Sequence, residues 1–396
     1  MPSKNLSNSV WIVAGLRTII GNPYKSLKKY TAVELASQVI NVLLHKSHIK
    51  NDAVDEVIIG NTVSAGIGQN LARQAALIAG LPPQTTAYTV NSVCGSSLQS
   101  VILGAQAIVA QSSRLVVAGG AESATHSPYI VKREDIIEKK EDAELLDSLF
   151  HDGLYCRLSG KSMGELIEAL AKKHHITRQE QDTFSLRSHR LACQAQEKHK
   201  FDHEIVPMGA LSKGTPPRDD RPRRNIKLES LQSLYPAFSE IGSVTAGNSS
   251  APCDAAAVLL LASKEFVRQN KLKPRGKMIG YASAAVNPED VFESATVAIQ
   301  ECLKVCQLKL DEIDLFEIGE AFASQVLIVQ KQLHIPDEKL NIYGGDIAFG
   351  HPLGAAGARI LVTLVNALHN EGKSKGLACI SFGGGGAIAI IIEAVK

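Results

Sequence analysis

Two stretches of the sequence repeat the same order of structural signals, and this repetition constrains the fold more than any other feature. The first stretch predicts a buried strand, a strand–turn–helix unit and another buried strand: VDEVIIG (54–60), VNSVCGSSLQSVILGAQAIVA (90–110) and LVVAGGAES (115–123). The second predicts a strand, a strand–glycine turn–helix unit and a strand pair around a glycine run: IDLFEIG (313–319), IYGGDIAFGHPLGAAGARILVTLVNAL (342–368) and LACISFGGGGAIAIIIE (377–393).

The matching elements are also nearly equally spaced along the chain. Gly60 and Gly319 are 259 positions apart, and Leu115 and Leu377 are 262 positions apart. Such a constant offset indicates an internal duplication, although strand–glycine–helix units occur by coincidence in many α/β proteins. Short strands that alternate with helices predict mainly parallel sheets, covered by helices on both faces.

Residues 124–240 differ in character from both repeated stretches. They include a charged run at 132–142 that predicts a solvated helix, a capping box from Thr177 to Glu180 that starts a long polar helix, and a Pro- and Arg-rich loop at 215–227. We interpret this region as an inserted loop domain that covers a ligand site, because long loops are often functional. It separates an N-terminal core half (1–123 and 241–272) from a C-terminal core half (273–396).

The composition excludes several classes of protein. A formal net charge of +2 lacks the basic bias of a nucleic-acid-binding protein, and no apolar run approaches the ~18 residues of a membrane span. The start, MPSKNLSNSV, has no apolar core of a signal peptide. Seven scattered cysteines without a CxxC pair fit a reducing compartment, so we expect a cytoplasmic protein: Cys94, Cys156, Cys193, Cys253, Cys302, Cys306 and Cys379.

Cys94 and His351 occupy corresponding turns of the two repeats. Cys94 lies in NSVCGSS just before a predicted helix, whose macrodipole and free N–H groups favour a thiolate. His351 lies in GHPLGAAG, where glycines and a proline hold an imidazole at the start of another helix. Taken singly, these residues also fit a buried structural cysteine and a helix-capping turn. In a two-fold arrangement the turns meet, which predicts a nucleophile beside its base.

With these two turns in place, the sequence resembles the thiolase family (acetyl-CoA acetyltransferase and 3-ketoacyl-CoA thiolase) over almost its whole length. Nine segments in the family's order carry the resemblance: GLRTIIG (15–21), NSVCGSS (91–97), AGGAESATHSPY (118–129), HDGL (151–154), PAF (236–238), SVTAGNSS (243–250), GEAFASQ (319–325), GGDIAFGHPLGAAGARI (344–360) and GGGG (383–386). The resemblance implies a duplicated five-layer α/β/α/β/α core with the inserted loop domain.

The resemblance also implies a ping-pong acyl transfer. Cys94 would attack the thioester carbonyl of an acyl-CoA, His351 would activate the thiol, and the N–H groups of Cys94 and Gly383 would bind the oxyanion. Residues 383–386 equally describe a tight hairpin turn.

Coenzyme A is implied as part of the substrate, with no separate cofactor. Residues that match the family's CoA groove are Met163, Ala237, Phe238, Ala246, Ser250 and Phe322, and Arg223 (or Arg224) matches a residue that packs on the nucleotide. Alternatively, the basic loop around Arg223 is only a solvated charged segment. The resemblance further implies a homodimer or homotetramer.

Four departures from the family pattern concern the site. Ser381 replaces the cysteine that serves as acid/base toward the second acyl-CoA, and Gly319 replaces an asparagine that holds a water near the histidine. The loop at 287–299 lacks the usual MGxGP, and the family's HMG triplet reads Ser162-Met163-Gly164. Cys379, two residues before Ser381, could substitute as the base after a shift, although a packing role also fits it.

Three functions are compatible with this pattern. The leading hypothesis is an acetyl-CoA C-acyltransferase that forms or cleaves 3-ketoacyl-CoA through Cys94. Because Ser381 and Gly319 affect the condensation step, the second is an acyltransferase or acyl-CoA hydrolase without efficient condensation. The third is a non-catalytic partner that binds acyl-CoA.

Overall fold

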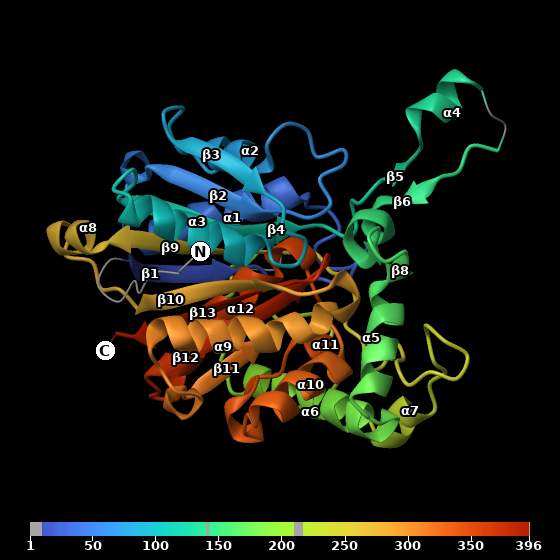
Figure 1. Ribbon diagram of the computed structural model, residues 1–396. Coiled ribbons are helices and arrows are strands. Elements are labelled where there is room, and N and C mark those ends of the chain that lie inside the picture. Colours follow the sequence, from blue (N-terminus) through green and yellow to red (C-terminus); the bar gives the residue numbers. More distant parts are fainter. Residues whose placement is uncertain (1–9, 140–141, 210–216, 396) are drawn as a thin grey trace.

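A computed structural model of the chain describes residues 10–139, 142–209 and 217–395 (Figure 1). Most of the chain's first ten residues, two residues of the charged run at 132–142 and the start of the loop at 215–227 therefore lie outside the described residues. The repeated stretches form one sheet in the order β11-β12-β13-β10-β1-β9-β4-β2-β3. Its strands are β1 (Val10–Arg17), β2 (Glu56–Gly60), β3 (Thr86–Val90), β4 (Leu115–Glu122), β9 (Ala255–Ser263), β10 (Gly276–Ala285), β11 (Leu315–Ile318), β12 (Lys375–Phe382) and β13 (Gly386–Ala394).

The sheet consists of two halves that only a short contact joins. β1 pairs with β10 through Trp11 and Ile12, while β9, β4, β2 and β3 extend one half and β13, β12 and β11 the other. The predicted mainly parallel order is wrong. β2 is parallel to β3 and β4, and β11 to β12, whereas the other neighbouring pairs are antiparallel. A tight turn joins β12 directly to β13, and chain neighbours joined in this way must run antiparallel.

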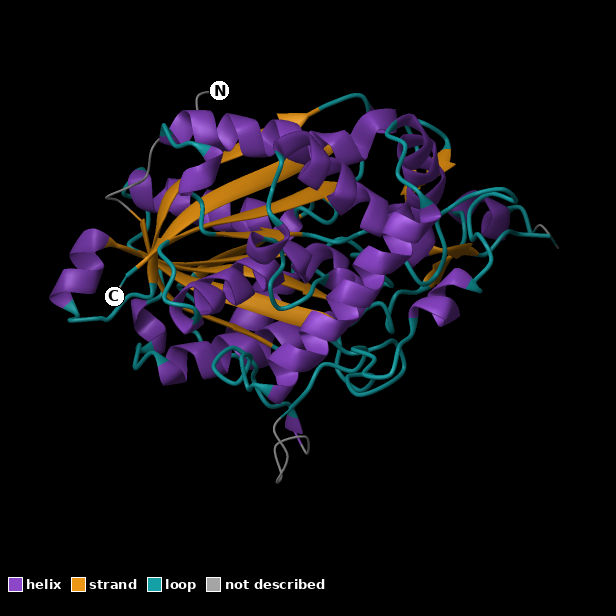
Figure 2. Cartoon of the chain, turned by 90° about the horizontal axis from the view of Figure 1, so that it is seen from below, coloured by secondary structure: helices purple, strands orange, loops and turns teal. Residues whose placement is uncertain are grey.

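Helices lie between the two half-sheets and cover their outer faces, which is the layered core that the resemblance implies (Figure 2). α3 and α12 pack on each other and on strands of the core, and the whole length of α12 up to Leu368 is buried, as a central layer requires. The helices of the core are α1 (Ala32–Lys46), α2 (Leu71–Ile78), α3 (Ser96–Val109), α8 (Lys264–Gln269), α9 (Ser294–Cys306), α10 (Ala323–Leu333), α11 (Asp346–Phe349) and α12 (Leu353–Asn370).

The second repeat departs from the prediction at its beginning. The strand predicted from residue 342 is absent, and the short helix α11 precedes α12 instead. Gly344 has a φ of 78° and Gly350 a φ of 99°, so the chain turns at both ends of this segment where an extended strand would continue. In the first half β3 pairs with β2. At the corresponding place in the second half, the described residues form only a single parallel bridge between Phe316 and Leu340.

The described parts of 124–240 pack on the outside of the core, and the segment from residue 124 to the start of the long helix lies beyond one end of the core strands (Figure 1). Their long polar helix begins at the predicted capping box, because Thr177 Oγ1 accepts from the Glu180 N–H while the Glu180 side chain accepts from the Thr177 N–H. The predicted helix within 132–142 is only five residues long. The elements are β5 (Tyr129–Ile130), α4 (Arg133–Ile137), β6 (Leu146–Asp147), a π-helix (Leu149–Leu154), β7 (Tyr155–Cys156), β8 (Lys161–Ser162), α5 (Met163–Lys173), α6 (Arg178–Glu197) and α7 (Leu228–Gln232).

A buried ion cluster fastens this region to β1. Arg17 binds Asp219 through two nitrogens, at 2.7 and 3.0 Å, and binds Glu204 Oε1 through Nε at 2.6 Å. All three side chains are almost completely buried. Removal of one partner from such a cluster leaves uncompensated charge in the interior.

Substitution Arg17→Met should therefore lower the free energy of unfolding by about 3–5 kcal/mol, because Glu204 and Asp219 would stay buried without their cation. Denaturant titration measures this loss. Arg114→Met is the matched control, since Arg114 is 66% exposed and its pair with Asp55 spans 3.4 Å. We expect a change below about 1 kcal/mol for that exposed pair. Equal effects of the two substitutions would contradict the role assigned to the buried cluster.

No helix in the described ranges is long and apolar enough to cross a membrane.

Candidate active site

The turn that carries Cys94 is held in an unusual backbone conformation. Val93 has a φ of 49°, a left-handed region that β-branched residues rarely enter. Side chains fix it on both sides. Asn91 Oδ1 accepts from the Val93 N–H at 2.9 Å, and Thr62 Oγ1 donates to the Val93 carbonyl at 3.0 Å. Cys94 therefore lies on a sharp, rigid turn just before the N-terminus of α3, where peptide dipoles favour negative charge.

His351 lies on the corresponding turn just before α12. Its backbone N–H donates to the Ala251 carbonyl at 2.8 Å, and the residue is 6% exposed. The two helices meet near these turns, since the Ala358 N–H donates to Ser97 Oγ at 2.9 Å. A Cβ added at Gly120 would lie 2.1 Å from the Gly354 carbonyl oxygen, so this junction leaves no room for a larger residue at 120.

Both turns open into one pocket. Its lining includes seven residues predicted from the sequence: Cys94, Met163, Ser250, Phe322, His351, Ser381 and Gly383. The walls that the sequence did not predict are mostly apolar: Gly153, Leu154, Pro252, Phe292, Ala321, Leu353 and Phe382. The arrangement places a thiol, an imidazole and a glycine turn around one small apolar space.

The turn at residues 383–386 lies close to Cys94 because the Phe382 ring packs against the turn that carries Cys94. A Cβ at Gly95 would lie 2.5 Å from the Phe382 ring, and one at Gly386 would lie 2.1 Å from it. Gly383 itself lies close to Val93, whose Cγ1 would be 3.6 Å from a Cβ at 383. Glycines at 95 and 386 are thus needed for the ring, and the ring holds the two turns together.

His351 is polarised by charges on both sides. Burial lowers its pKa, but Cys94 and Asp346 outweigh this effect and raise the pKa to about 10. Asp346 Oδ2 lies 3.1 Å from His351 Nδ1. A proton taken from the Cys94 thiol is therefore well held on the imidazole. Asp346 was not predicted from the sequence, although a signal was available: Asp346 and Arg359 are the only Asp, Glu, Lys or Arg residues in the apolar stretch 342–368.

Ser381 and Gly319, the two departures from the family pattern, both lie at this end of the core. Ser381 is buried in the pocket wall, and its Oγ lies 3.5 Å from Ser294 Oγ. Gly319 is outside the lining and lies next to Asp346 and Ile380. Cys379 does not reach the pocket. It is completely buried in the core against Ala295, and burial raises its pKa, so it has the packing role.

The remaining residues predicted for the CoA groove lie outside the pocket lining. Phe238 is 37% exposed and its ring lies 6.1 Å from that of Phe322, which places it next to the pocket. Ala237 and Ala246 are exposed, and the Ala237 N–H donates to Val244 in the same loop system. Arg223 is also exposed, and its backbone N–H donates to His189 Nδ1. These residues describe an open surface beside the pocket rather than part of its wall.

Comparison with known families matches both halves of the chain. Residues 10–265 match the thiolase N-terminal domain and residues 272–394 the thiolase C-terminal domain.

Two curated relatives are similar along nearly their whole length. An acetyl-CoA acetyltransferase of Escherichia coli (strain K12) is 42% identical, with 96% of this chain and 98% of the relative covered. A probable acetyl-CoA acyltransferase of Staphylococcus aureus (strain COL) is 40% identical, with 98% and 99% covered.

Two solved structures that contain coenzyme A share the fold. A thiolase from Ascaris suum in complex with coenzyme A has a TM-score of 0.93 at 37% identity and covers 98% of this chain and 100% of its own. Human mitochondrial 3-ketoacyl-CoA thiolase in complex with CoA has a TM-score of 0.95 at 34% identity, with both chains covered completely.

Proposed function

This chain belongs to the thiolase family, and from that premise we propose that it is an acetyl-CoA C-acyltransferase that forms or cleaves 3-ketoacyl-CoA. The observation that carries the proposal is the shared pocket of Cys94 and His351, each at the N-terminus of one of the two paired central helices. A nucleophile with an adjacent base at a helix N-terminus suits acyl transfer.

In the first half-reaction Cys94 becomes acylated. His351 accepts the thiol proton, and Cys94 Sγ attacks the carbonyl carbon of the thioester. The N–H groups of Cys94 and Gly383 would stabilise the oxyanion, because both residues face the pocket; such donors are worth roughly 3–4 kcal/mol each. When the C–S bond to coenzyme A breaks, the proton on His351 passes to the leaving thiolate, and the acyl-Cys94 thioester remains.

In the second half-reaction a base takes a proton from the α-carbon of a second acyl-CoA, and the resulting carbanion attacks the carbonyl carbon of acyl-Cys94. The bond between this carbon and Cys94 Sγ then breaks, 3-ketoacyl-CoA leaves, and the Cys94 thiolate takes up the proton that the base removed. Ser381 stands where the family resemblance puts the base for this step, and a hydroxyl is a poor base compared with a thiolate, whose reference pKa is about 8.5. Thiolysis runs through the same steps in reverse. We therefore propose that carbon–carbon bond formation or cleavage, rather than acylation of Cys94, limits turnover.

Coenzyme A thioesters are the proposed partners, with no separate cofactor. Two relatives were solved with coenzyme A, and the residues beside the pocket can supply an equivalent groove. Ser250 and Met163 line the inner part, Ala237, Ala246 and Phe238 the outer part, and exposed Arg223 supplies positive charge for the phosphates.

We also propose a homodimer or homotetramer in the cytoplasm. β3 is an edge strand of the sheet, and unpaired edges are protected in most proteins. The arm formed by β5, α4 and β6 projects from the body of the molecule and exposes apolar side chains, which favours contact with another subunit (Figure 1). These side chains are Tyr129, Ile136, Ile137 and Leu145. The seven cysteines are all free thiols, as a reducing compartment requires.

Cleavage of acetoacetyl-CoA by free coenzyme A tests the proposed function. The purified protein should release acetyl-CoA at a rate that is proportional to protein concentration and is lost on alkylation of Cys94. Folded protein without turnover, in both the cleavage and the condensation direction, would overturn the proposal.

A further inference from the structure

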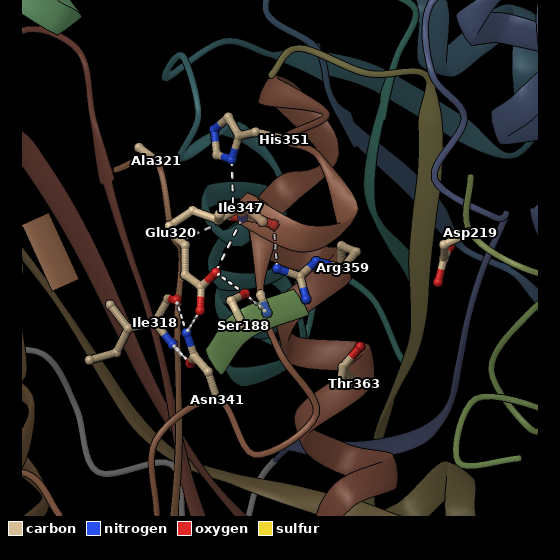
Figure 3. A network of polar contacts seen from close by, with 12 residues as sticks. Ser188, Asp219, Ile318, Glu320, Ala321, Asn341, Ile347, His351, Arg359 and Thr363 are labelled. Carbon is tan, nitrogen blue, oxygen red and sulfur yellow. Dashed lines mark hydrogen bonds and ion pairs between the residues drawn. The ribbon is translucent and has the colours of Figure 1, made fainter. Parts of the chain in front are cut away.

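The ring nitrogen Nδ1 of His351 contacts the carboxylate of Asp346, a residue that no sequence motif identified. In His351, Nδ1 lies 3.1 Å from Asp346 Oδ2, while Nε2 has no hydrogen-bond partner among the described residues and belongs to the pocket shared with Cys94. Asp346 is completely buried and opens the short helix α11. Its other oxygen binds Arg359 of α12. In Figure 3, His351 and Arg359 lie on different sides of Ile347, the residue that follows Asp346.

The position of His351 by itself disfavours the protonated form of the imidazole. His351 precedes the N-terminus of α12, and the positive end of a helix dipole disfavours a protonated imidazole. Burial disfavours it as well. Asp346 opposes both effects, provided that it stays ionised. Burial raises the pKa of Asp346, but Arg359 and His351 outweigh burial and hold it below its usual value.

The other charged groups around this pair do not replace Asp346. Glu317 and Glu320 are completely buried, and burial raises the pKa of both carboxyls, which favours their neutral forms. Arg221 lies near Gly350, and its positive charge opposes protonation of the imidazole. Among the described neighbours, Asp346 is therefore the ionised carboxylate in contact with His351.

Gly319 provides space for this carboxylate. A Cβ at position 319 would lie 3.6 Å from Asp346 Oδ2 and 3.1 Å from Ile380 Cγ1, so a longer side chain would crowd Asp346. The Glu320 N–H also donates to Asp346 Oδ2, at 3.2 Å. The family resemblance expects an asparagine side chain at position 319. Here Gly319 has none, and the Asp346 carboxylate of α11 is the polar group beside His351 instead.

We propose that Asp346 is a positioning residue for His351, so that Cys94, His351 and Asp346 act together in the transfer of the thiol proton. Its carboxylate accepts the Nδ1–H of His351 and so fixes the tautomer whose Nε2 receives the Cys94 proton. Arg359 anchors the carboxylate. The consequence for acyl transfer rests on the proposed function: His351 keeps the proton until the leaving thiolate of coenzyme A takes it.

Alkylation of Cys94 by iodoacetamide tests this role of Asp346 without an acyl-CoA substrate. The rate at Cys94 is followed by peptide mass spectrometry at about pH 6 and about pH 9, in the wild type, Asp346→Asn and Asp346→Ala. A reference cysteine is largely protonated at the lower pH. We expect both variants to lower the ratio of the rate at pH 6 to that at pH 9 by at least tenfold, because His351 then holds the thiol proton less tightly.

Glu204→Gln is the matched control, because Glu204 is also a buried carboxylate bound to an arginine but has no contact with His351. A merely structural effect changes alkylation at both pH values and leaves the ratio unaltered. An unchanged ratio in folded Asp346 variants, or an equal change in Glu204→Gln, would overturn the proposal. If only the proposed function is wrong, the wild type will not cleave acetoacetyl-CoA. Its ratio of the Cys94 alkylation rate at about pH 6 to that at about pH 9 will still be higher than in the Asp346 variants.

Discussion

Substitution Cys94→Ala should reduce turnover of acetoacetyl-CoA by about 10⁶-fold, which is the scale on which loss of a catalytic nucleophile acts. The reason is chemical rather than structural. A methyl group cannot form the thioester on which both half-reactions depend. Affinity for coenzyme A should stay within a few-fold of the wild type. Steady-state cleavage rates and equilibrium binding of coenzyme A measure the two quantities.

Cys193→Ala is the control for this experiment. Cys193 lies in α6, buried and outside the pocket lining, so its loss should change turnover by less than about threefold. Residual activity above about 1% in Cys94→Ala would mean that acyl transfer does not proceed through Cys94, since loss of a nucleophile costs far more.

Substitution Ser381→Cys should raise the rate of acetoacetyl-CoA cleavage by about 10²–10⁴-fold, the usual contribution of a well-placed general acid or base. Position 381 is suited to this exchange because its side chain already faces the pocket with Cys94 and His351. Among the described residues its hydroxyl forms one hydrogen bond, a long contact of 3.5 Å with Ser294 Oγ, so a larger sulfur atom displaces no strong hydrogen bond.

Ser381→Ala separates the effect of a new base from the loss of the hydroxyl. If Ser381 contributes little as a base, the alanine variant should retain most of the wild-type rate. Formation of the acyl adduct on Cys94 should be equally fast in all three proteins, because acylation does not use position 381. An unchanged cleavage rate in Ser381→Cys would show that the base at 381 does not limit the carbon–carbon step.

The duplicated core could be predicted because the hydrophobic pattern and the glycines repeat at a constant offset. The direction of the strands could not, since a buried strand has the same composition in either direction. Predicting antiparallel β12 and β13 required treating the glycine run as the tight turn that joins them. The missing strand before α11 follows from the left-handed backbone at Gly344 and Gly350, which composition alone does not reveal.

Cys94 and His351 could be predicted because each lies in a short, distinctive turn of its own repeat. Asp346 could not be identified in the same way, because its role arises from three segments that meet only in the fold. Its carboxylate contacts the residue before α12, an arginine within α12 and the N–H of Glu320. The sequence contained one signal for its role. Buried charged side chains are normally paired, so a lone acidic and a lone basic residue in an apolar stretch predict an ion pair between them.

The mass of the intact protein after brief mixing with acetyl-CoA tests the central claim most directly. The wild type should gain the mass of one acetyl group, the gain should map to the peptide that contains Cys94, and Cys94→Ala should gain nothing. An unmodified wild-type protein, or an adduct that persists in Cys94→Ala, would contradict the assignment of Cys94 as the acyl acceptor.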